Sequence, residues 1–447
     1  MQENQLMTER VSTLCLKFCI PAVISMAIAG MQTMVDGLFV GNVIGSDAMA
    51  SVNIASPFMQ LIIGISMVMS IGAQSYMGLT FGEGNEKKGQ NIFKTSVILI
   101  TIMGILVTVL GVFYHTQLAS LLGANEVLFE NVSIYIKTLA FYAVPMMWMF
   151  LFGFSNRIIN KPELYFKAMI VSLVANVLLN YILIARLELG MIGAATATGL
   201  SYIAALIIVA IPMLNQKSAI NIFSGTFDKT TIKPVLYNGS SEGINSIAAA
   251  VCAYVFNMAF MSVAGEDGVA AFTAINYIAY FGILLMFGIS DGIGPLISYN
   301  YGSRQFERVH DILKIAYKGI GGVAIFIFII LIFFGRDLAT LFIQGDTLLL
   351  DLAEIGAKIY AFSFLFNGFN IVYSGFFTAI GHARASVIVA AARGLLFILI
   401  GIFILPKLFG LNGVWLTVPF AEGCTFVISL QLLKTVHREM AQYSIEL

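Results

Sequence analysis

Long apolar runs, each near the length of a membrane span, alternate with short polar segments along the whole chain. A helix needs about 20 mostly apolar residues to cross the hydrocarbon core of a bilayer. The first half contains such runs at 13–40, 51–80, 92–113, 132–155, 164–185 and 191–213. The second half contains them at 234–262, 270–300, 311–334, 352–379, 385–406 and 411–433. The pattern therefore predicts an all-α polytopic membrane protein with twelve transmembrane helices.

Composition supports the membrane assignment and excludes a soluble globular protein. Of the 447 residues, 59% are hydrophobic and 11% are charged, and the mean hydropathy is +0.91. Soluble domains carry about 25% charged residues. The net charge is zero and no basic block is present, so no nucleic-acid partner is expected. The four cysteines lie in apolar segments without metal-ligand spacing, which indicates packing residues and no metal site.

Short motifs repeat between the two halves at an offset of about 220 residues. "GSDAMA" (45–50) matches "GEDGVA" (265–270), and "LGMIGAA" (189–195) matches "FGLNGVW" (409–415). Because each copy has an even number of spans, both copies enter the membrane in the same orientation. This predicts two six-helix lobes related by a pseudo-two-fold axis along the membrane normal, an architecture of transporters. The expected domains are an N-terminal lobe at 1–214, a cytoplasmic linker at 215–234 and a C-terminal lobe at 235–447.

Lysine and arginine residues are concentrated in the loops on one side of the predicted membrane. The loops on the opposite side hold only Arg186, Arg336 and Lys407. Since cytoplasmic loops carry the excess of positive charge, both termini are predicted to be cytoplasmic. The chain is expected in the inner or plasma membrane as a multi-pass protein. It lacks the GxxxxGK[ST] pattern of an ATP site, and nothing in it indicates an enzyme.

Several motifs resemble the multidrug and toxic compound extrusion (MATE) family over nearly the whole chain. They are "IPAVISM" and "MVDGLFVG" in the first span, "ANVLLNYILI" in the fifth, "GMIGAATATGLS" opening the sixth and "GIGPLISYNYGS" leaving the eighth. "NGSSEGI" (238–244) is similar to the bacterial branch related to DinF. The resemblance implies a monomeric secondary exporter of small organic, often cationic, compounds. It implies alternating access driven by inward H⁺ or Na⁺ flow, without a cofactor.

Asp36 is the sole acidic residue within the predicted spans of the first half, and its repeat position is Phe256 or Asn257. A charge at the bilayer centre costs about 2.5–3.5 kcal/mol on insertion scales. One interpretation is that Asp36 marks a helix end in water. The resemblance implies instead that Asp36 belongs to a site for cation or proton coupling. The other residues that the resemblance assigns to this site are Asn176, Asn180, Thr198 and, as a weaker candidate, Tyr142.

The coupling ion depends on how much negative charge this site holds. Many relatives of this branch have an aspartate where this chain has Asn180. A site with one carboxylate has less negative charge for sodium, and burial of a single carboxylate disfavours its charged form. Proton coupling is therefore favoured, with Na⁺ at Asp36 as the alternative. Asn176 and Asn180 share one helix face, and simple interhelical hydrogen bonding remains an alternative for both.

A second polar set lies in the spans of the other half. Its members are about 9–12 residues from the cytoplasmic helix ends, a depth of about 13–18 Å, so they share one layer. Intramembrane charges usually pair with one another, which predicts a structural pair of Arg393 and Glu422. Glu242 and Asp291 are either interfacial or part of a site that attracts a cationic substrate.

The remaining candidates concern the substrate cavity and a bend in the first span. Methionine is an adaptable, polarizable contact, so four methionines are candidates for a drug cavity, with packing or lipid contact as the alternative. They are Met31, Met34, Met146 and Met286. Pro21 is predicted to kink the first span, which would let it bend when Asp36 changes protonation.

One alternative function belongs to the same superfamily. A lipid-linked oligosaccharide flippase would share helices of this kind, but we would expect more basic residues along its cavity. The candidate polar residues deep in the predicted spans are mainly acidic, which favours an exporter of cationic compounds. They are Asp36, Glu242, Asp291 and Glu422, against the single basic residue Arg393.

Overall fold

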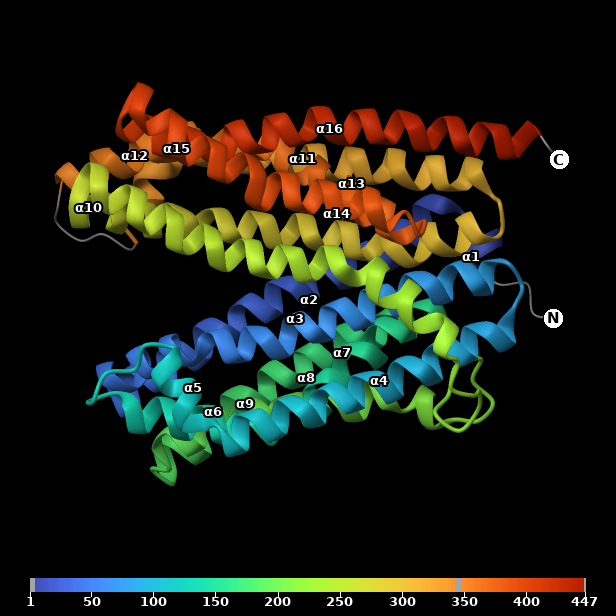
Figure 1. Ribbon diagram of the computed structural model, residues 1–447, viewed down its shortest axis with the longest axis horizontal. Coiled ribbons are helices and arrows are strands. Elements are labelled where there is room, and N and C mark those ends of the chain that lie inside the picture. The colour runs from blue at the N-terminus through green and yellow to red at the C-terminus, as the bar shows by residue number, and fades with distance from the viewer. Residues whose placement is uncertain (1–4, 342–346, 446–447) are drawn as a thin grey trace. The chain divides into compact units, whose positions relative to one another are not determined.

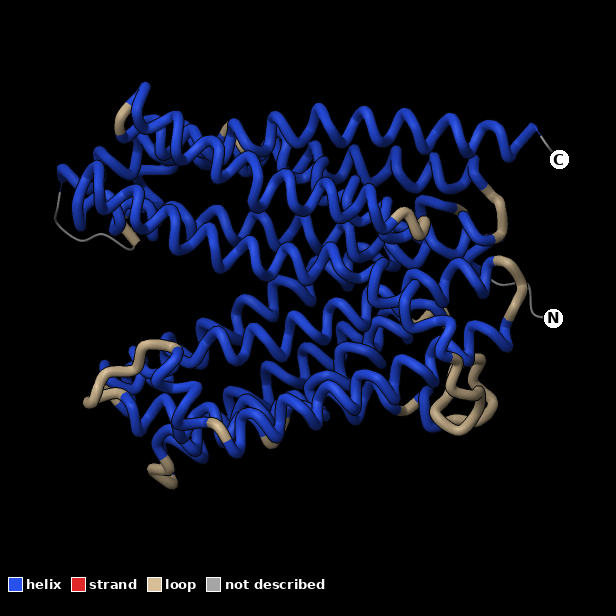
Figure 2. The backbone as a smooth tube through the Cα atoms, viewed as in Figure 1, coloured by secondary structure: helices blue, strands red, loops and turns tan. Residues whose placement is uncertain are grey.

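The chain folds into helices, turns and loops. The computed structural model describes residues 5–341 and 347–445, and this part of the chain contains no β-strand (Figure 2). The predicted all-α class is confirmed. Figure 1 labels the helices along the chain.

The helices of the first half follow the six predicted apolar runs. In order they are α1 (Gln5–Thr8), α2 (Val11–Phe39), α3 (Ser46–Gly82), α4 (Glu86–Phe113), α5 (His115–Leu121), α6 (Phe129–Ala140), α7 (Ala143–Ile158), α8 (Pro162–Asn180) and α9 (Gly190–Ala210). Two π-helical turns extend α2 and α8, namely η1 (Val40–Ile44) and η2 (Tyr181–Arg186). A 3₁₀ turn, η3 (Pro212–Leu214), follows α9.

The helices of the second half begin after the polar connection between the two copies. A 3₁₀ turn, η4 (Lys229–Thr231), leads into them. They are α10 (Ile232–Gly302), α11 (Phe306–Ala339), α12 (Thr347–Ala361), α13 (Phe364–Ala379), α14 (Ala383–Ala391), α15 (Phe397–Phe409) and α16 (Leu411–Ile445). The π-helical turn η5 (Ala392–Leu396) joins α14 to α15.

Helix breaks account for the difference between the helices and the predicted spans. Nine helices among the described residues are long and apolar enough to cross a membrane, and the pair α6 and α7, bent by 53°, adds a tenth span. The helix α10 is one of these nine helices, but it contains two predicted spans. Gly265, with φ 63° and ψ −153°, breaks it between them. Figure 1 shows the α10 ribbon turning back on itself. Together, α12 and α13 occupy the predicted span at 352–379.

The sequence repeat is also present in the backbone. Residues with positive φ recur in the second half 220 or 221 positions later, and each lies at a break between helical segments. The pairs are Gly45 and Gly265, Gly84 and Arg304, Asn160 and Gly381, and Gly190 and Gly410. Left-handed backbone is costly for most residues, so its recurrence marks equivalent turns. Each half is therefore built on the same order of helices and turns.

Contacts divide the chain into two units that exchange short segments. Unit 1 comprises Met1–Thr8 and Ile24–Gly239, and unit 2 comprises Glu9–Val23 and Ser240–Leu447. The first part of α2 thus belongs to unit 2, and the first turns of α10 belong to unit 1. The predicted lobes did not include this exchange.

Glycines allow the exchanged segments to pack closely inside the unit that receives them. In unit 1, a Cβ atom on Gly72 of α3 would overlap the carbonyl oxygen of Val235. In unit 2, a Cβ atom on Gly292 of α10 would lie 2.6 Å from the Cα atom of Cys19. Contacts between backbones this close need a residue without a side chain. Gly72 and Gly292 are again 220 positions apart, so both units use the same device.

Each unit has its own aromatic core. In unit 1, the rings of Phe93 (α4) and Phe152 (α7) lie 5.8 Å apart, and the Trp148 indole N–H donates to the hydroxyl of Thr101 at 2.8 Å. In unit 2, the edge-to-face pair of Phe260 and Trp415 has its ring centroids 4.7 Å apart. The pair in unit 2 joins α10 and α16, two of the helices that carry the polar residues described next.

Candidate functional site

Asp36 lies near the end of α2, where it is half-buried within unit 1. Its carboxylate accepts three hydrogen bonds from neighbouring helices. The side-chain amides of Asn176 and Asn180 both donate to Oδ1 at 2.8 Å, and the Thr198 hydroxyl donates to Oδ2 at 3.3 Å. All three donors are neutral. Four of the five residues assigned to this region by resemblance therefore lie together, which is inconsistent with a carboxylate that only marks a helix end.

The packing of α8 on α9 places these donors beside Asp36. Asn176 and Asn180 lie one turn apart on α8, and Asn180 is its last residue before the π-helical turn η2. Both are fully buried, and the Asn180 amide also donates to Asn176 Oδ1 at 3.1 Å. Thr198 lies on the buried face of α9. The spacing of four along α8 is what lets two amides reach one carboxylate oxygen.

The side-chain oxygen of Asn180 is the unsatisfied group of this site. It is buried, and it has no hydrogen-bond partner among the described residues. A buried acceptor without a partner carries a desolvation penalty of about 1–3 kcal/mol. Such an oxygen can accept from a protonated carboxyl group or contribute to a cation site, since hard cations prefer oxygen ligands.

A second polar layer lies one helical turn before Asp36, and sequence reasoning missed it. The Gln32 amide donates to the Ser201 hydroxyl at 3.2 Å, and the Ser172 hydroxyl donates to Gln32 Oε1 at 3.2 Å. Gln32, Ser172 and Ser201 are all buried. Their spacing was the available signal, because Gln32 precedes Asp36 by four residues and Ser172 precedes Asn176 by four. The layer fixes α2 against α8 and α9 beneath the carboxylate.

Two tyrosines differ in how they relate to the site. Tyr135 of α6 is buried, and its hydroxyl is close enough to interact with Thr198 and with the charge of Asp36. Sequence reasoning missed this residue and favoured Tyr142 for the same predicted span. The ring of Tyr142 instead packs over Gly199, where a Cβ atom would overlap it. Asp36 accepts its hydrogen bonds from other residues, and a role for Tyr142 in coupling stays a prediction.

In unit 2, Arg393 and Glu422 form a hydrogen-bonded ion pair. The Arg393 guanidinium donates to Glu422 Oε1 from Nη2 at 2.9 Å and from Nε at 3.2 Å. The pair is well buried, with 12% of the Arg393 side chain and 5% of the Glu422 side chain exposed. Two asparagines add hydrogen bonds to the pair. Arg393 Nη2 donates to Asn367 Oδ1 at 3.2 Å, and the Asn370 amide donates to Glu422 Oε2 at 2.7 Å. The predicted pairing is present, with two asparagines that the sequence did not single out.

Glu242 and Asp291 lie on the two arms of α10, before and after the break at Gly265. Glu242 is close enough to interact with the charges of Asp291 and Arg393, and it accepts a long hydrogen bond from Asn245 at 3.5 Å. The structure thus gathers all four charged residues of the predicted second set within unit 2. Glu242 and Asp291 therefore lie in the same unit as the ion pair of Arg393 and Glu422.

The other sequence candidates lie in different environments. Met31 and Met34 on α2 are 50% and 64% exposed, whereas Met146 and Met286 are fully buried in the packing of their own units. Buried methionines contribute to packing, so only the first two are accessible in this structure. Pro21 lies within the continuous helix α2, two residues before the point where α2 passes from unit 2 to unit 1. The proposed bend at Pro21 stays a prediction.

Comparisons with known proteins agree with this arrangement. The model of the MatE family matches residues 21–182 and 243–403, one segment in each half. The chain is 24% identical over 408 residues to the multidrug export protein MepA of Staphylococcus aureus (strain bovine RF122 / ET3-1), covering 91% of this chain and 90% of the relative. It is 27% identical over 411 residues to the protein of the same name from Staphylococcus saprophyticus, covering 91% and 89%.

The fold agrees with solved structures as well. An outward-facing conformation of a multidrug resistance MATE family transporter of the MOP superfamily superposes with a TM-score of 0.91 at 20% identity. The match covers 98% of this chain and 99% of that chain. It extends over both units and confirms the predicted fold. Assignment to the DinF-related branch stays a prediction.

Proposed function

The chain belongs to the MatE family, a family of membrane transporters, and on this premise we propose that it is a secondary multidrug exporter in which Asp36 couples export to inward ion flow. The observation that carries the coupling role is a carboxylate held only by neutral donors in an apolar helix bundle. The names of its relatives support small organic compounds as the exported class.

The hydrogen bonds of Asp36 favour a proton as the coupling ion. A charged carboxylate accepts all three of its hydrogen bonds, whereas a protonated one must also donate. Asn180 Oδ1, buried and without a partner among the described residues, supplies an acceptor for that donor. Binding and release of a proton would therefore rearrange the contacts between α2, α8 and α9. If these contacts favour one conformation when Asp36 is protonated and another when it is charged, proton binding shifts the equilibrium between the two conformations.

Sodium remains the competing coupling ion. A sodium ion at Asp36 would use the carboxylate together with the Asn180 oxygen. One carboxylate supplies a single negative charge, and nothing cationic contacts it among the described residues. Alternating access then requires the ion and the drug to favour different conformations, so that binding one weakens binding of the other.

Two acids of unit 2 support a cationic substrate. The cluster contains the carboxylates of Glu242, Asp291 and Glu422, and Arg393 pairs with Glu422. A cationic compound would gain from this charge once it leaves water. We place both termini in the cytoplasm of the cell, because the connections assigned to that side carry most of the lysine and arginine residues.

Drug transport in vesicles with separately imposed gradients tests this function. The full chain is reconstituted, and transport of a fluorescent organic cation is followed under a proton gradient alone, a sodium gradient alone, and neither. We expect export under the proton gradient and none without a gradient. Export that persists with both gradients collapsed would contradict ion-coupled antiport. Export under the sodium gradient alone would identify sodium, and not the proton, as the coupling ion.

A further inference from the structure

The connection between the two halves, residues 215–231, is fixed along the first turns of α4. Four side chains of α4 make six hydrogen bonds to its backbone. Gln90 alone makes three, two from its amide to the carbonyls of Asn221 and Ser224, at 2.6 and 3.0 Å, and one accepted from the Asn221 N–H at 2.9 Å. Lys94 donates to the carbonyl of Ile222 at 2.6 Å. The connection is therefore an ordered part of unit 1.

Close packing at a glycine supports the same description. Gly225 has φ +79°, and a Cβ atom there would lie 3.0 Å from both Cγ and the carbonyl oxygen of Gln90. Ile220 and Asn221, both part of the connection, are buried. The side chains that face outward are consequently presented by a backbone that is already ordered, which lowers the cost of binding through them.

Those outward side chains are aromatic and basic. Phe223 and Phe227 are 57% and 50% exposed, although phenylalanine is usually buried. Three exposed lysines accompany them, namely Lys217, Lys229 and Lys233, and none forms an ion pair within the described residues.

The one acid of this stretch is engaged locally. Asp228 accepts from the Thr230 hydroxyl at 2.6 Å and from the Thr230 N–H at 2.9 Å, and these hydrogen bonds hold its pKa below the ordinary value. Asp228 therefore stays charged. Because the same stretch carries three lysines, it remains positively charged overall.

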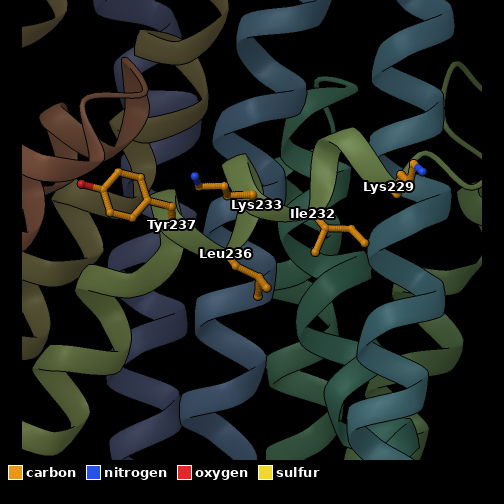
Figure 3. A pocket seen from close by; sticks show the side chains of 5 residues that line it. All are labelled: Lys229, Ile232, Lys233, Leu236 and Tyr237. Atoms are coloured by element: carbon orange, nitrogen blue, oxygen red, sulfur yellow. The ribbon is translucent and has the colours of Figure 1, made fainter.

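An open pocket adjoins the lysines at the start of α10. Lys229, Ile232, Lys233, Leu236 and Tyr237 line it. Figure 3 shows the polar ends of the two lysines and Tyr237 at a similar level, with the side chains of Ile232 and Leu236 below them in the view. Positive charge above an apolar floor, at the end of membrane-spanning helices, complements a lipid with an anionic headgroup.

We propose that residues 217–237 form a binding site for an anionic phospholipid of the cytoplasmic leaflet, with Lys229 and Lys233 on the headgroup phosphate and Phe223 and Phe227 in the interface. The proposal rests on the cytoplasmic orientation given under the proposed function. The cytoplasmic leaflet carries the anionic lipids, and each lysine near such a surface strengthens binding about fivefold.

The test is titration of the purified full chain with phosphatidylglycerol, followed by native mass spectrometry. The Lys229→Gln/Lys233→Gln variant is expected to lose about fivefold in affinity for each lysine removed. The matched control is Lys161→Gln/Lys167→Gln, which removes two exposed lysines beside α8 and should bind as the wild type does. Equal affinity in all three proteins would overturn the proposal.

Two further measurements test the position of the lipid and distinguish it from a free phosphate ion. Phe223→Trp should add a fluorescence component that brominated phosphatidylglycerol quenches more than brominated phosphatidylcholine, relative to the wild type with its own two tryptophans. No added quenching would contradict the interfacial position. Inorganic phosphate should compete weakly, and competition as strong as that of the lipid would indicate a free-phosphate site instead.

Export assays on the same proteins distinguish the two proposals. The lysine variant should still export in phosphatidylcholine vesicles, since neither lysine belongs to the coupling site. Wild-type protein that binds phosphatidylglycerol but exports nothing would count against the exporter and leave the lipid site standing. Wild-type protein that exports but shows no preference for phosphatidylglycerol would count against the lipid site and leave the exporter standing.

Discussion

The polar clusters of the two units differ in how their buried charge is compensated. In unit 1, Asp36 has three neutral donors and no cationic partner among the residues described. In unit 2, Glu422 has a guanidinium and an amide, and its charge is cancelled in place. A carboxylate held by neutral groups can take up a proton or a cation without breaking an ion pair, whereas a paired carboxylate would first have to lose its guanidinium partner. The two units thus share one order of helices, but a carboxylate with neutral donors is present in unit 1 and a carboxylate paired with a guanidinium in unit 2.

Removing the charge of Asp36 is expected to have the largest effect on export. In Asp36→Asn the three donors remain, but the side chain can neither gain nor lose a proton. Export driven by a proton gradient should fall to background in reconstituted vesicles, with little change in the amount of folded protein. Asp47→Asn, on the exposed first turn of α3, is the control and should export normally. Undiminished export by Asp36→Asn would remove the distinction between the clusters.

Breaking the pair in unit 2 should affect stability. Arg393→Met leaves Glu422 buried without its cation, and removing one partner of a buried pair costs about 3–5 kcal/mol. The double variant Arg393→Met/Glu422→Leu should recover most of this loss, since no uncompensated charge remains. Thermal unfolding in detergent measures both. A single variant as stable as the wild type would show that the pair is not structural.

A second carboxylate beside Asp36 should change the ion that the site prefers. In Asn180→Asp the new acid would lie against Asp36 Oδ1, which the Asn180 amide now contacts at 2.8 Å. Two carboxylates at that distance favour a shared proton or a bound cation. We expect sodium, compared with potassium, to raise the Tm of the variant more than that of the wild type. A tenfold gain in sodium affinity corresponds to about 1.4 kcal/mol. Equal responses to the two ions would argue against a cation site here.

The layer beneath Asp36 should give the smallest effect. Gln32→Met keeps the volume and removes two interhelical hydrogen bonds, each worth about 0.6 kcal/mol on average in membrane proteins. The Tm should fall slightly, by the equivalent of about 1 kcal/mol. Thr33→Val, on the exposed face of the same helix, is the control and should change stability by less than about 0.5 kcal/mol. A loss of export in Gln32→Met with unchanged Tm would assign this layer to coupling.

Sequence reasoning was most successful where residues lie close along the chain. Most of the predicted span boundaries agree with the helices within a few residues, because hydrophobic length is a local property. The exception is α16, which continues to Ile445 beyond the predicted end at 433. Asn176 and Asn180 were placed on one face by their spacing alone, and the structure brings both to Asp36. The two spans predicted at 234–262 and 270–300 correspond to the two arms of α10 on either side of the break at Gly265.

It was less successful where the rotation of a helix decides the neighbours. Tyr135 and Tyr142 belong to the same predicted span, but Tyr135 interacts with Thr198, whereas the ring of Tyr142 packs over Gly199. Met146 was an equal candidate with Met31 for the substrate cavity, yet packing buries the first and exposes the second. Periodicity assigns residues to faces, and it does not say which face meets which helix.

The sequence by itself determined the twelve spans, the duplication and the single acidic residue within the spans of the first half. These follow from hydrophobic length, repeated spacing and the cost of an intramembrane charge, all of which act locally. The tertiary structure alone decided that α2 begins in one unit and ends in the other, and that Asn180 keeps a buried oxygen without a partner within the described chain. It also decided which asparagines complete the Arg393 pair. Those features depend on contacts between residues far apart in the chain, whose geometry only the packed helices set.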